Sequence, residues 1–332
     1  CDAADRLRRR GNGATVSHGG NRNINHTNVC YFRCQVCAFA KGKMSESLRG
    51  TPYDLGLDEV VRRSVEAWER GATEVCMQGG IHPEYTGATY LDILRAVKEA
   101  LPEMHIHAFS PLEVSQGAEI RVTLCPDKLR TQEWLDVVEA AHRTGFRTTS
   151  TIMSGHIDQP INWARHLVAL RDLQKRTGGI TEFVPLPFVH MEAPIYLKGK
   201  ARRGPTFREA VLMHAVARLA LHPHITNIQV SWVKMGVEGV KACLNAGVND
   251  MGGTLMNESI SRAAGAAFGQ ELPPGEMERT IRALGRVPRQ RTTTYGAVPE
   301  ERLITSFNAA PLSPIVLTPA RKYERKKQRV SA

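Results

Sequence analysis

The chain has 332 residues, of which 42% are hydrophobic and 6% aromatic, and its formal net charge is +11. A chain of this length and composition can bury a large core, which excludes a disordered or collagen-like protein. No stretch approaches the roughly 18–20 unbroken apolar residues of a membrane-spanning helix, and residues 1–10 lack the apolar core of a secretory signal. Because the first residue is not Met, we expect the chain to start inside a longer product.

Between residues 24 and 256 one unit recurs, made of a helix-period stretch, a Gly and a short β-rich run. In one instance a helix that begins near Asp58 ends at Gly71, just ahead of a β-rich run. This alternation predicts parallel strands with helices outside them. We expect seven strands, at residues 25–30, 73–78, 105–110, 147–152, 181–188, 227–233 and 249–255.

Seven strands are one fewer than a closed (β/α)8 barrel of the TIM type needs. The alternation fails at residues 112–130, where Pro126 argues against a central strand. An open doubly wound sheet would also suit seven strands, but no G-x-G-x-x-G sequence follows the first of them. The barrel is therefore the better prediction. We expect it in residues 20–300, with a polar segment at 1–19 before it and a basic tail at 301–332 after it.

The tail contains the basic run at residues 321–329. Such a run at a chain end is more typical of a solvated terminus than of a nucleic-acid-binding arm, and no zinc-finger or helix-turn-helix spacing accompanies it. We therefore expect neither nucleic acid nor a membrane as a partner.

Six of the expected strands end in polar or Gly-rich sequence. The C-terminal ends of barrel strands form the active-site face, so six such ends on one rim predict an enzyme. The sequences concerned are residue 30 onward and residues 78–82, 110–111, 154–156, 187–190 and 252–254.

Three of the seven cysteines, Cys30, Cys34 and Cys37, form a C-x3-C-x2-C group at the end of the first expected strand. This odd, partly clustered set does not resemble a secreted disulfide framework, so we expect a reducing compartment, cytoplasmic or organellar. Three neighbouring thiolates suit a soft metal centre. A structural zinc would need a fourth ligand, for which only His26 is near. A [4Fe–4S] cluster held by three thiolates would leave one iron open to another molecule.

The cysteine loop resembles that of the radical S-adenosylmethionine (SAM) superfamily, whose C-x3-C-x2-C loop follows the first barrel strand. Longer blocks resemble the tyrosine-using subunit of FO synthase, and the resemblance covers about residues 20–296. It implies that the open iron binds SAM and that one electron splits SAM into methionine and a 5′-deoxyadenosyl radical. The blocks are residues 25–30, 37–39, 71–83, 105–111, 181–188, 222–229, 252–256 and 289–293.

By this resemblance the reaction is transfer of the 4-hydroxybenzyl group of L-tyrosine to 5-amino-6-(D-ribitylamino)uracil, a step toward the deazaflavin FO of coenzyme F420. The implied partners are the ring-closing FO synthase subunit, separate or fused, and a one-electron donor. Gly79 and Gly80 would let backbone approach SAM, because Gly has no Cβ to block the contact. The expected SAM-binding residues are Phe39, Gln78, Gly79, Gly80, Ser110 and Thr151, and the expected catalytic residues are His107, Glu113, His156 and His190.

Two features depart from the family. Val36 stands where the family usually has an aromatic residue, and about one βα unit, roughly 30 residues, is missing near residues 113–121. Losing a strand would open the hydrogen-bond ladder of the barrel. One alternative is therefore a catalytically dead iron–sulfur module. The others are an aminofutalosine-type radical SAM enzyme of menaquinone biosynthesis and a zinc amidohydrolase that uses the His105 and His107 pair.

Overall fold

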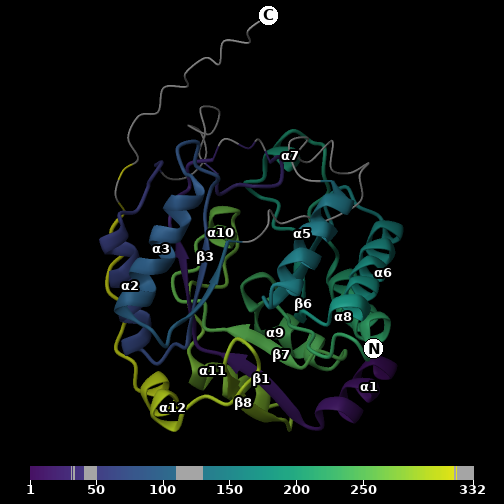
Figure 1. The fold of residues 1–332 in the computed structure, drawn as a ribbon. Coiled ribbons are helices and arrows are strands. Elements are labelled where there is room, and N and C mark those ends of the chain that lie inside the picture. The colour runs from purple at the N-terminus through teal and green to yellow at the C-terminus, as the bar shows by residue number, and fades with distance from the viewer. Residues whose placement is uncertain (31, 33, 41–50, 110–129, 318, 320–332) are drawn as a thin grey trace, which may run out of the picture.

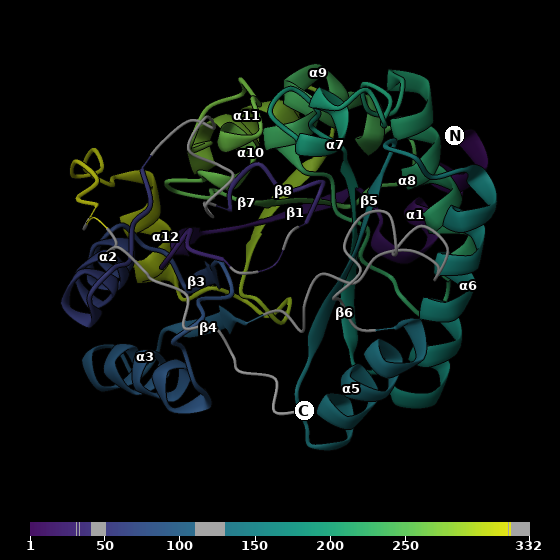
Figure 2. The ribbon, with the colours of Figure 1, turned by 90° about the horizontal axis from the view of Figure 1, so that it is seen from above.

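The structure is a computed structural model that describes residues 1–30, 32, 34–40, 51–109, 130–317 and 319. Parallel strands occupy the interior and helices surround them (Figures 1 and 2). The strands are β1 (Thr15–Gly19), β2 (Asn21–Asn25), β3 (Glu74–Gln78), β4 (His105–Ala108), β5 (Thr148–Ser154), β6 (Ile180–Pro187), β7 (Asp250–Gly253) and β8 (Val287–Arg291). The helices are α1 (Asp2–Asn12), α2 (Leu57–Glu69), α3 (Gly87–Ala100), α5 (Thr131–Arg143), α6 (Pro160–Thr177), α7 (Pro194–Leu197), α8 (Phe207–Leu221), α9 (Trp232–Leu244), α10 (Ile260–Ala263), α11 (Pro274–Arg282) and α12 (Glu300–Phe307).

The ladders that join these strands are all parallel, in the orders β2-β3-β4, β5-β6 and β7-β1-β8. Single parallel bridges, Arg22 to Met256, Phe183 to Ile228 and Gln229 to Asp250, continue the wall between them. The wall therefore runs from β4 through β3, β2, β7 and β6 to β5. Within the described ranges no ladder joins β4 to β5, which is where the sequence predicts that a βα unit is missing.

Alternation along the strands separates an apolar outer face from a polar inner one. In β3, Val75 and Met77 are fully buried in the cluster under α2 and α3, whereas Glu74, Cys76 and Gln78 point the other way. In β2 only Ile24 joins that cluster. A second cluster lies between β5, β6 and β7 and the helices α5, α6, α8, α9 and α11. The barrel interior is thus lined by polar side chains.

Several boundaries differ from the expectation. Residues 1–19, treated above as a polar segment ahead of the barrel, form α1 and β1, and β1 pairs with both β7 and β8. The first strand is Asn21–Asn25 rather than residues 25–30, and residues 227–233 make only single bridges before α9 begins. The strand β8 was not expected. The strands β1, β2 and β8 carry mostly polar residues, so their apolar alternation is weak. Residues 227–233 do alternate, but α9 begins at Trp232 and ends the extended stretch.

Residues 15–25 form one extended run that is interrupted only at Gly20. Its first half pairs with β7 and β8, and its second half pairs with β3. Among the helices in the described parts of the chain, none is both long enough and apolar enough to cross a membrane.

Candidate active site

The three cysteines lie in the loop that follows β2, at the C-terminal end of the barrel strands, and all three are half-buried. The Cys37 N–H donates to the Cys34 carbonyl at 3.2 Å, which closes a tight turn between them. The Ala40 N–H lies 3.4 Å from the Cys37 Sγ and donates to it. An amide donor aimed at sulfur favours the thiolate form, which is the form that binds metal.

Among the side chains that the structure describes, no group of three or more His, Cys, Asp or Glu is already arranged as metal ligands. The chemistry of the donors nevertheless fits an iron–sulfur cluster. Three half-buried cysteines lie within one eight-residue loop, and a backbone amide supports one of their sulfurs. Thiolates on a short loop are the usual ligands of such clusters.

The Gly79–Gly80 turn packs directly against the segment that leads into this loop. The Gly80 N–H donates to the Thr27 carbonyl at 2.8 Å. A Cβ added at Gly80 would lie 2.2 Å from the Val29 carbonyl oxygen and 2.9 Å from the Cys30 Cβ, and one added at Gly79 would lie 2.4 Å from the His26 Nε2. The two glycines are therefore already required by contact within the protein, a reason that the sequence did not indicate.

His26 is the side chain that fills the space beside Gly79. It is 2% exposed, and neither ring nitrogen has a hydrogen-bond partner among the described residues. Its ring stacks on Tyr85 at 5.9 Å and meets the edges of Tyr90 and Phe109. Burial lowers the pKa of His26 to about 4, so the imidazole is neutral near pH 7.

The middle of the cysteine loop rests on α7. The Ile195 N–H donates to the Gln35 carbonyl at 2.9 Å, and the Lys198 Nζ donates to the Gln35 side chain at 2.7 Å. Val36, which replaces the usual aromatic residue, packs into the apolar cluster that contains Phe188 and Ile195. The loop is therefore held from the β6 side as well as from the Gly79–Gly80 turn.

His156 and His190 lie near this end of the barrel, in the segments that follow β5 and β6. The buried His156 has its Nδ1 3.0 Å from an oxygen of Asp158. Burial alone would raise the pKa of Asp158, but hydrogen bonds from His156, Gly155 and Trp163 hold it well below its usual value. Beside them is an open surface cavity of about 550 Å³, lined among others by His156, Asp158, Lys200 and Arg202. His190 is half-buried against the Tyr196 ring at 4.5 Å.

The remaining expected residues are not gathered at one point. Phe39 is buried in the cluster under α2, with its ring 6.4 Å from that of Tyr53. Gln78 ends β3, and Thr151 lies in β5 with its carbonyl 3.0 Å from the His166 Nε2. Ser110 and Glu113 lie outside the described residues.

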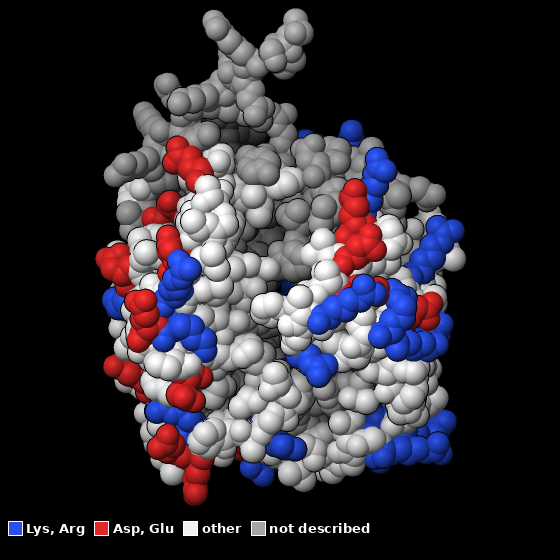
Figure 3. Space-filling view, in the orientation of Figure 1, with Lys and Arg blue, Asp and Glu red and all other residues white. Residues whose placement is uncertain are grey.

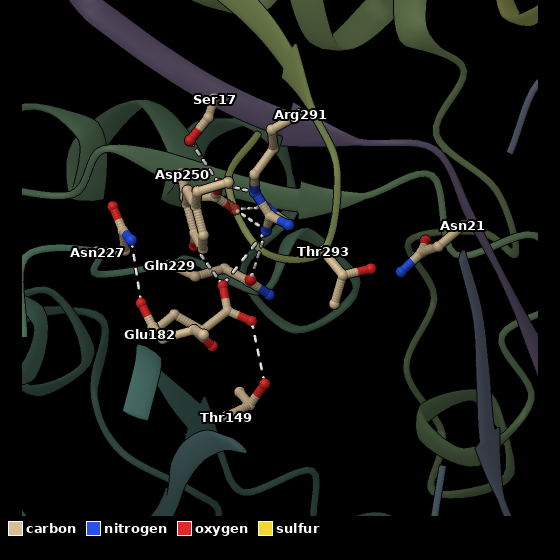
Figure 4. A network of polar contacts seen from close by, with 12 residues as sticks. Ser17, Asn21, Thr149, Glu182, Asn227, Gln229, Asp250, Arg291 and Thr293 are labelled. Atoms are coloured by element: carbon tan, nitrogen blue, oxygen red, sulfur yellow. Dashed lines mark hydrogen bonds and ion pairs between the residues drawn. The ribbon is translucent and has the colours of Figure 1, made fainter. Parts of the chain in front are cut away.

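A network of charged side chains lies away from this loop, where β3 and β7 begin and β8 ends (Figure 4). Asp250, which is fully buried, accepts hydrogen bonds from the Arg291 guanidinium at 2.6 and 2.9 Å and from the Ser17 hydroxyl at 2.6 Å. Arg291 also lies 3.3 Å from Glu182. The Tyr295 hydroxyl also donates to Glu182.

His107 joins the same network from β4. Its Nδ1 is 3.5 Å from a Glu74 oxygen and its Nε2 is 3.4 Å from the Thr149 hydroxyl, which in turn lies 3.3 Å from Glu182. Burial opposes protonation of His107, but Glu74 outweighs it and raises the pKa of His107. Burial likewise raises the pKa of Glu182. Thr293 completes the network by donating to Glu74.

We call this set of residues the barrel floor. It comprises Ser17, Glu74, His107, Thr149, Glu182, Gln229, Asp250, Arg291, Thr293 and Tyr295. Only His107 was predicted as a site residue. A signal was present, because Glu74, Glu182 and Asp250 are charged residues inside expected strands, where a buried charge needs a partner.

Comparison with known proteins agrees with this geometry. Residues 24–131 match the model of the radical SAM superfamily, which implies a [4Fe–4S] cluster and SAM, and residues 177–303 match the CofH/MqnC C-terminal region. The FO synthase of Streptomyces coelicolor is 48% identical over 91% of this chain, but the chain spans only 38% of that protein. The 5-amino-6-(D-ribitylamino)uracil–L-tyrosine 4-hydroxyphenyl transferase of Methanopyrus kandleri is 46% identical over 86% of this chain and 85% of that protein.

The match to the Streptomyces coelicolor protein also gives the number of its positions that have no counterpart in this chain. It extends over 334 aligned positions, whereas 91% of this 332-residue chain is about 302 residues. About 32 positions of the relative therefore face gaps in this chain. That length is close to the roughly 30 residues predicted from the sequence. Within the described residues no ladder joins β4 to β5.

Solved structures show the same fold. Methylornithine synthase (PylB) superimposes with a TM-score of 0.68 at 16% identity, over 86% of this chain and 87% of that one. The FeFe-hydrogenase maturase HydG from Carboxydothermus hydrogenoformans gives a TM-score of 0.67 at 18% identity, over 88% of this chain and 72% of that one. These likenesses and the parallel strands confirm the predicted barrel. Together with the identity to the Methanopyrus kandleri transferase, they establish that the chain belongs to the radical SAM superfamily and, within it, to the FO synthase tyrosine 4-hydroxyphenyl transferase family.

Proposed function

We propose that this chain transfers the 4-hydroxybenzyl group of L-tyrosine to 5-amino-6-(D-ribitylamino)uracil. The observation that carries the proposal is the 46% identity, over 85% of its length, to a relative named for that transfer. The FO synthases that match this chain support it as well. Their names favour this reaction over the aminofutalosine and zinc hydrolase alternatives.

In this proposal Cys30, Cys34 and Cys37 hold the [4Fe–4S] cluster through three thiolates. When bound, the cluster and SAM supply the radical that removes a hydrogen atom from tyrosine. The protein's own part is to fix the loop that carries the ligands. The Gly79–Gly80 turn supports it on one side, and the contacts of Gln35 with α7 support it on the other.

The other expected residues keep their roles as proposals. Gly79 and Gly80 would contact SAM through their backbone. Side-chain contacts to SAM would come from Phe39, Gln78, Ser110 and Thr151, and contacts to the two substrates from His107, Glu113, His156 and His190. A radical reaction needs both substrates held close together and water kept out, and a barrel interior supplies such an enclosure.

The remaining partners follow from the length of the relatives. Since the chain spans 38% of the FO synthase of Streptomyces coelicolor, we propose that the ring-closing activity resides in a fused half or a separate subunit. A one-electron donor would reduce the cluster. Both requirements are compatible with a reducing compartment.

A second candidate is an iron–sulfur module that does not turn over. It is favoured by one specific observation, the absence of pairing between β4 and β5 among the described strands, together with the gap of about 32 positions against the relative. A barrel wall that lacks one strand would expose a reactive intermediate to water.

Anaerobic reconstitution separates the two candidates. Active protein should bind iron and sulfide and form 5′-deoxyadenosine from SAM when tyrosine and the uracil substrate are present, with the coupled product detected by mass spectrometry. Cys34→Ala should abolish 5′-deoxyadenosine formation, whereas the control Cys1→Ala, at an exposed position outside the loop, should not. A bound cluster without SAM cleavage supports the inactive module, and unchanged cleavage in Cys34→Ala refutes the cysteine assignment.

A further inference from the structure

The barrel floor lies about one strand length below the cysteine loop. Glu74 begins β3 and Gln78 ends it, and at a rise of roughly 3.3 Å per residue these positions are about 13 Å apart. A small molecule that reached from the mouth of the barrel to the floor would therefore be extended and about that long. The face seen in Figure 3 is hollowed between the surface over α3 and the surface over α5, on the side where the described residues show no ladder between β4 and β5.

The floor keeps polar groups accessible. Five of its side chains are only half-buried, and they come from four separate segments around the buried carboxylates of Glu182 and Asp250. Because these groups stay partly exposed, a bound molecule can reach them without unfolding the floor. The five are His107, Thr149, Gln229, Thr293 and Tyr295.

The floor also has more carboxylates than cationic side chains. Glu74, Glu182 and Asp250 supply three carboxylates, which face one guanidinium, Arg291, and one imidazole, His107. A buried ion cluster of this kind is seldom more stabilising than apolar residues of the same volume. Stability alone therefore does not account for it, whereas recognition of a ligand rich in hydroxyl donors would.

We propose that the barrel floor binds the ribityl chain of the uracil substrate, an inference that rests on the proposed function. The chain's hydroxyl groups would donate to Glu182, to Glu74 and to the oxygen of the Tyr295 hydroxyl, whose own proton stays directed at Glu182, and would accept from the Gln229 amide. Carboxylates bind sugar hydroxyl groups in the same way in dinucleotide sites. The uracil ring would then lie nearer the mouth, where the radical forms.

The test compares two ligands on the anaerobically reconstituted full chain without SAM. The ligands are 5-amino-6-(D-ribitylamino)uracil and 5,6-diaminouracil, which lacks the ribityl chain, and binding is measured by equilibrium dialysis. Wild-type protein should bind the ribityl compound at least about tenfold more tightly. Glu182→Gln and Tyr295→Phe should remove most of that difference and leave diaminouracil binding unchanged. The control Glu139→Gln, on the outer surface of α5, should keep it.

Circular dichroism shows whether each variant folds. If Glu182→Gln does not fold, the test relies on Tyr295→Phe alone. Equal affinities of the wild type for the two ligands, or no binding of either, would overturn the inference. So would a difference that survives in both variants. Tyrosine transfer by the wild type alongside equal affinities would leave the proposed function standing and remove the floor's role. If the wild type prefers the ribityl compound and both variants lose that preference, but no tyrosine transfer is seen, the floor's role stands and the proposed function is refuted.

Discussion

The contact between Gly79 and His26 allows a sharp test of how the Gly79–Gly80 turn is held. A Cβ at Gly79 would lie 2.4 Å from the His26 Nε2 and 2.5 Å from its Cε1. The ring would have to retreat by about 1 Å to reach an ordinary van der Waals contact of 3.4 Å. It cannot do so freely, because it is 2% exposed and packed against three other aromatic rings. We therefore expect Gly79→Ala to destabilise the fold by about 1–3 kcal/mol, the usual cost of overpacking.

Removing the imidazole should relieve most of this cost. In a His26→Ala background the added methyl group enters the space that the ring has left, so Gly79→Ala should cost at least about 1 kcal/mol less than in the wild type. Urea unfolding of the wild type, both single variants and the double variant measures this coupling. Iron content after reconstitution, followed in parallel, should fall in Gly79→Ala and recover in the double variant.

Gly80→Ala is the matched control. Its Cβ would meet the Val29 carbonyl oxygen at 2.2 Å, which is backbone, so His26→Ala should not rescue it. If Gly79→Ala costs the same with and without the imidazole, the ring is not the constraint and the packing argument is refuted.

Three further predictions concern stability. The Arg218 guanidinium is buried and donates to the Gly247 carbonyl at 2.7 Å and to the Thr226 carbonyl at 2.5 Å. Arg218→Met should therefore lower the free energy of unfolding, measured in urea, by about 3 kcal/mol. An unchanged unfolding midpoint would contradict this. Burial lowers the pKa of His214 to about 4, so this histidine binds its proton more tightly in the unfolded chain than in the folded one. The free energy of unfolding should therefore fall by up to about 3 kcal/mol between pH 6.5 and pH 4. His214→Gln should reduce this dependence of stability on pH. Hydrogen bonding to a neighbouring arginine lowers the pKa of Glu59 to about 2. Its contribution to stability is therefore present above pH 4.5 and lost as the pH falls toward 2. Glu59→Gln should remove that part of the loss of stability in acid, and an acid-unfolding curve identical to that of the wild type would argue against the assignment.

The sequence predicted best those strands that have an apolar outer face. The run expected at residues 73–78 is β3 at Glu74–Gln78, and the run expected at 181–188 is β6 at Ile180–Pro187. In β3 the alternate residues Val75 and Met77 pack under helices, and in β6 Ile180 and Phe183 do so. By contrast β2 reads Asn-Arg-Asn-Ile-Asn and β8 reads Val-Pro-Arg-Gln-Arg. Their inner faces line a polar interior, so little alternation remains for a sequence pattern to detect.

The candidate site divides in the same way. The cysteine loop and the Gly pair are local features whose spacing survives in the sequence, and the structure does bring them into contact. The floor depends on partners that are far apart along the chain, such as Ser17 and Asp250 or Glu182 and Arg291. Spacing carries no information about such pairs until the strand order is known. The sequence could therefore show that buried charges exist, but not how they pair.

The extended run of residues 15–25 has a mechanical consequence. Its first half, β1, lies between β7 and β8 and contributes Ser17 to the floor. Its second half, β2, pairs with β3 and leads into the cysteine loop. A movement of β1 in the floor would reach the cysteine loop along this one stretch of backbone.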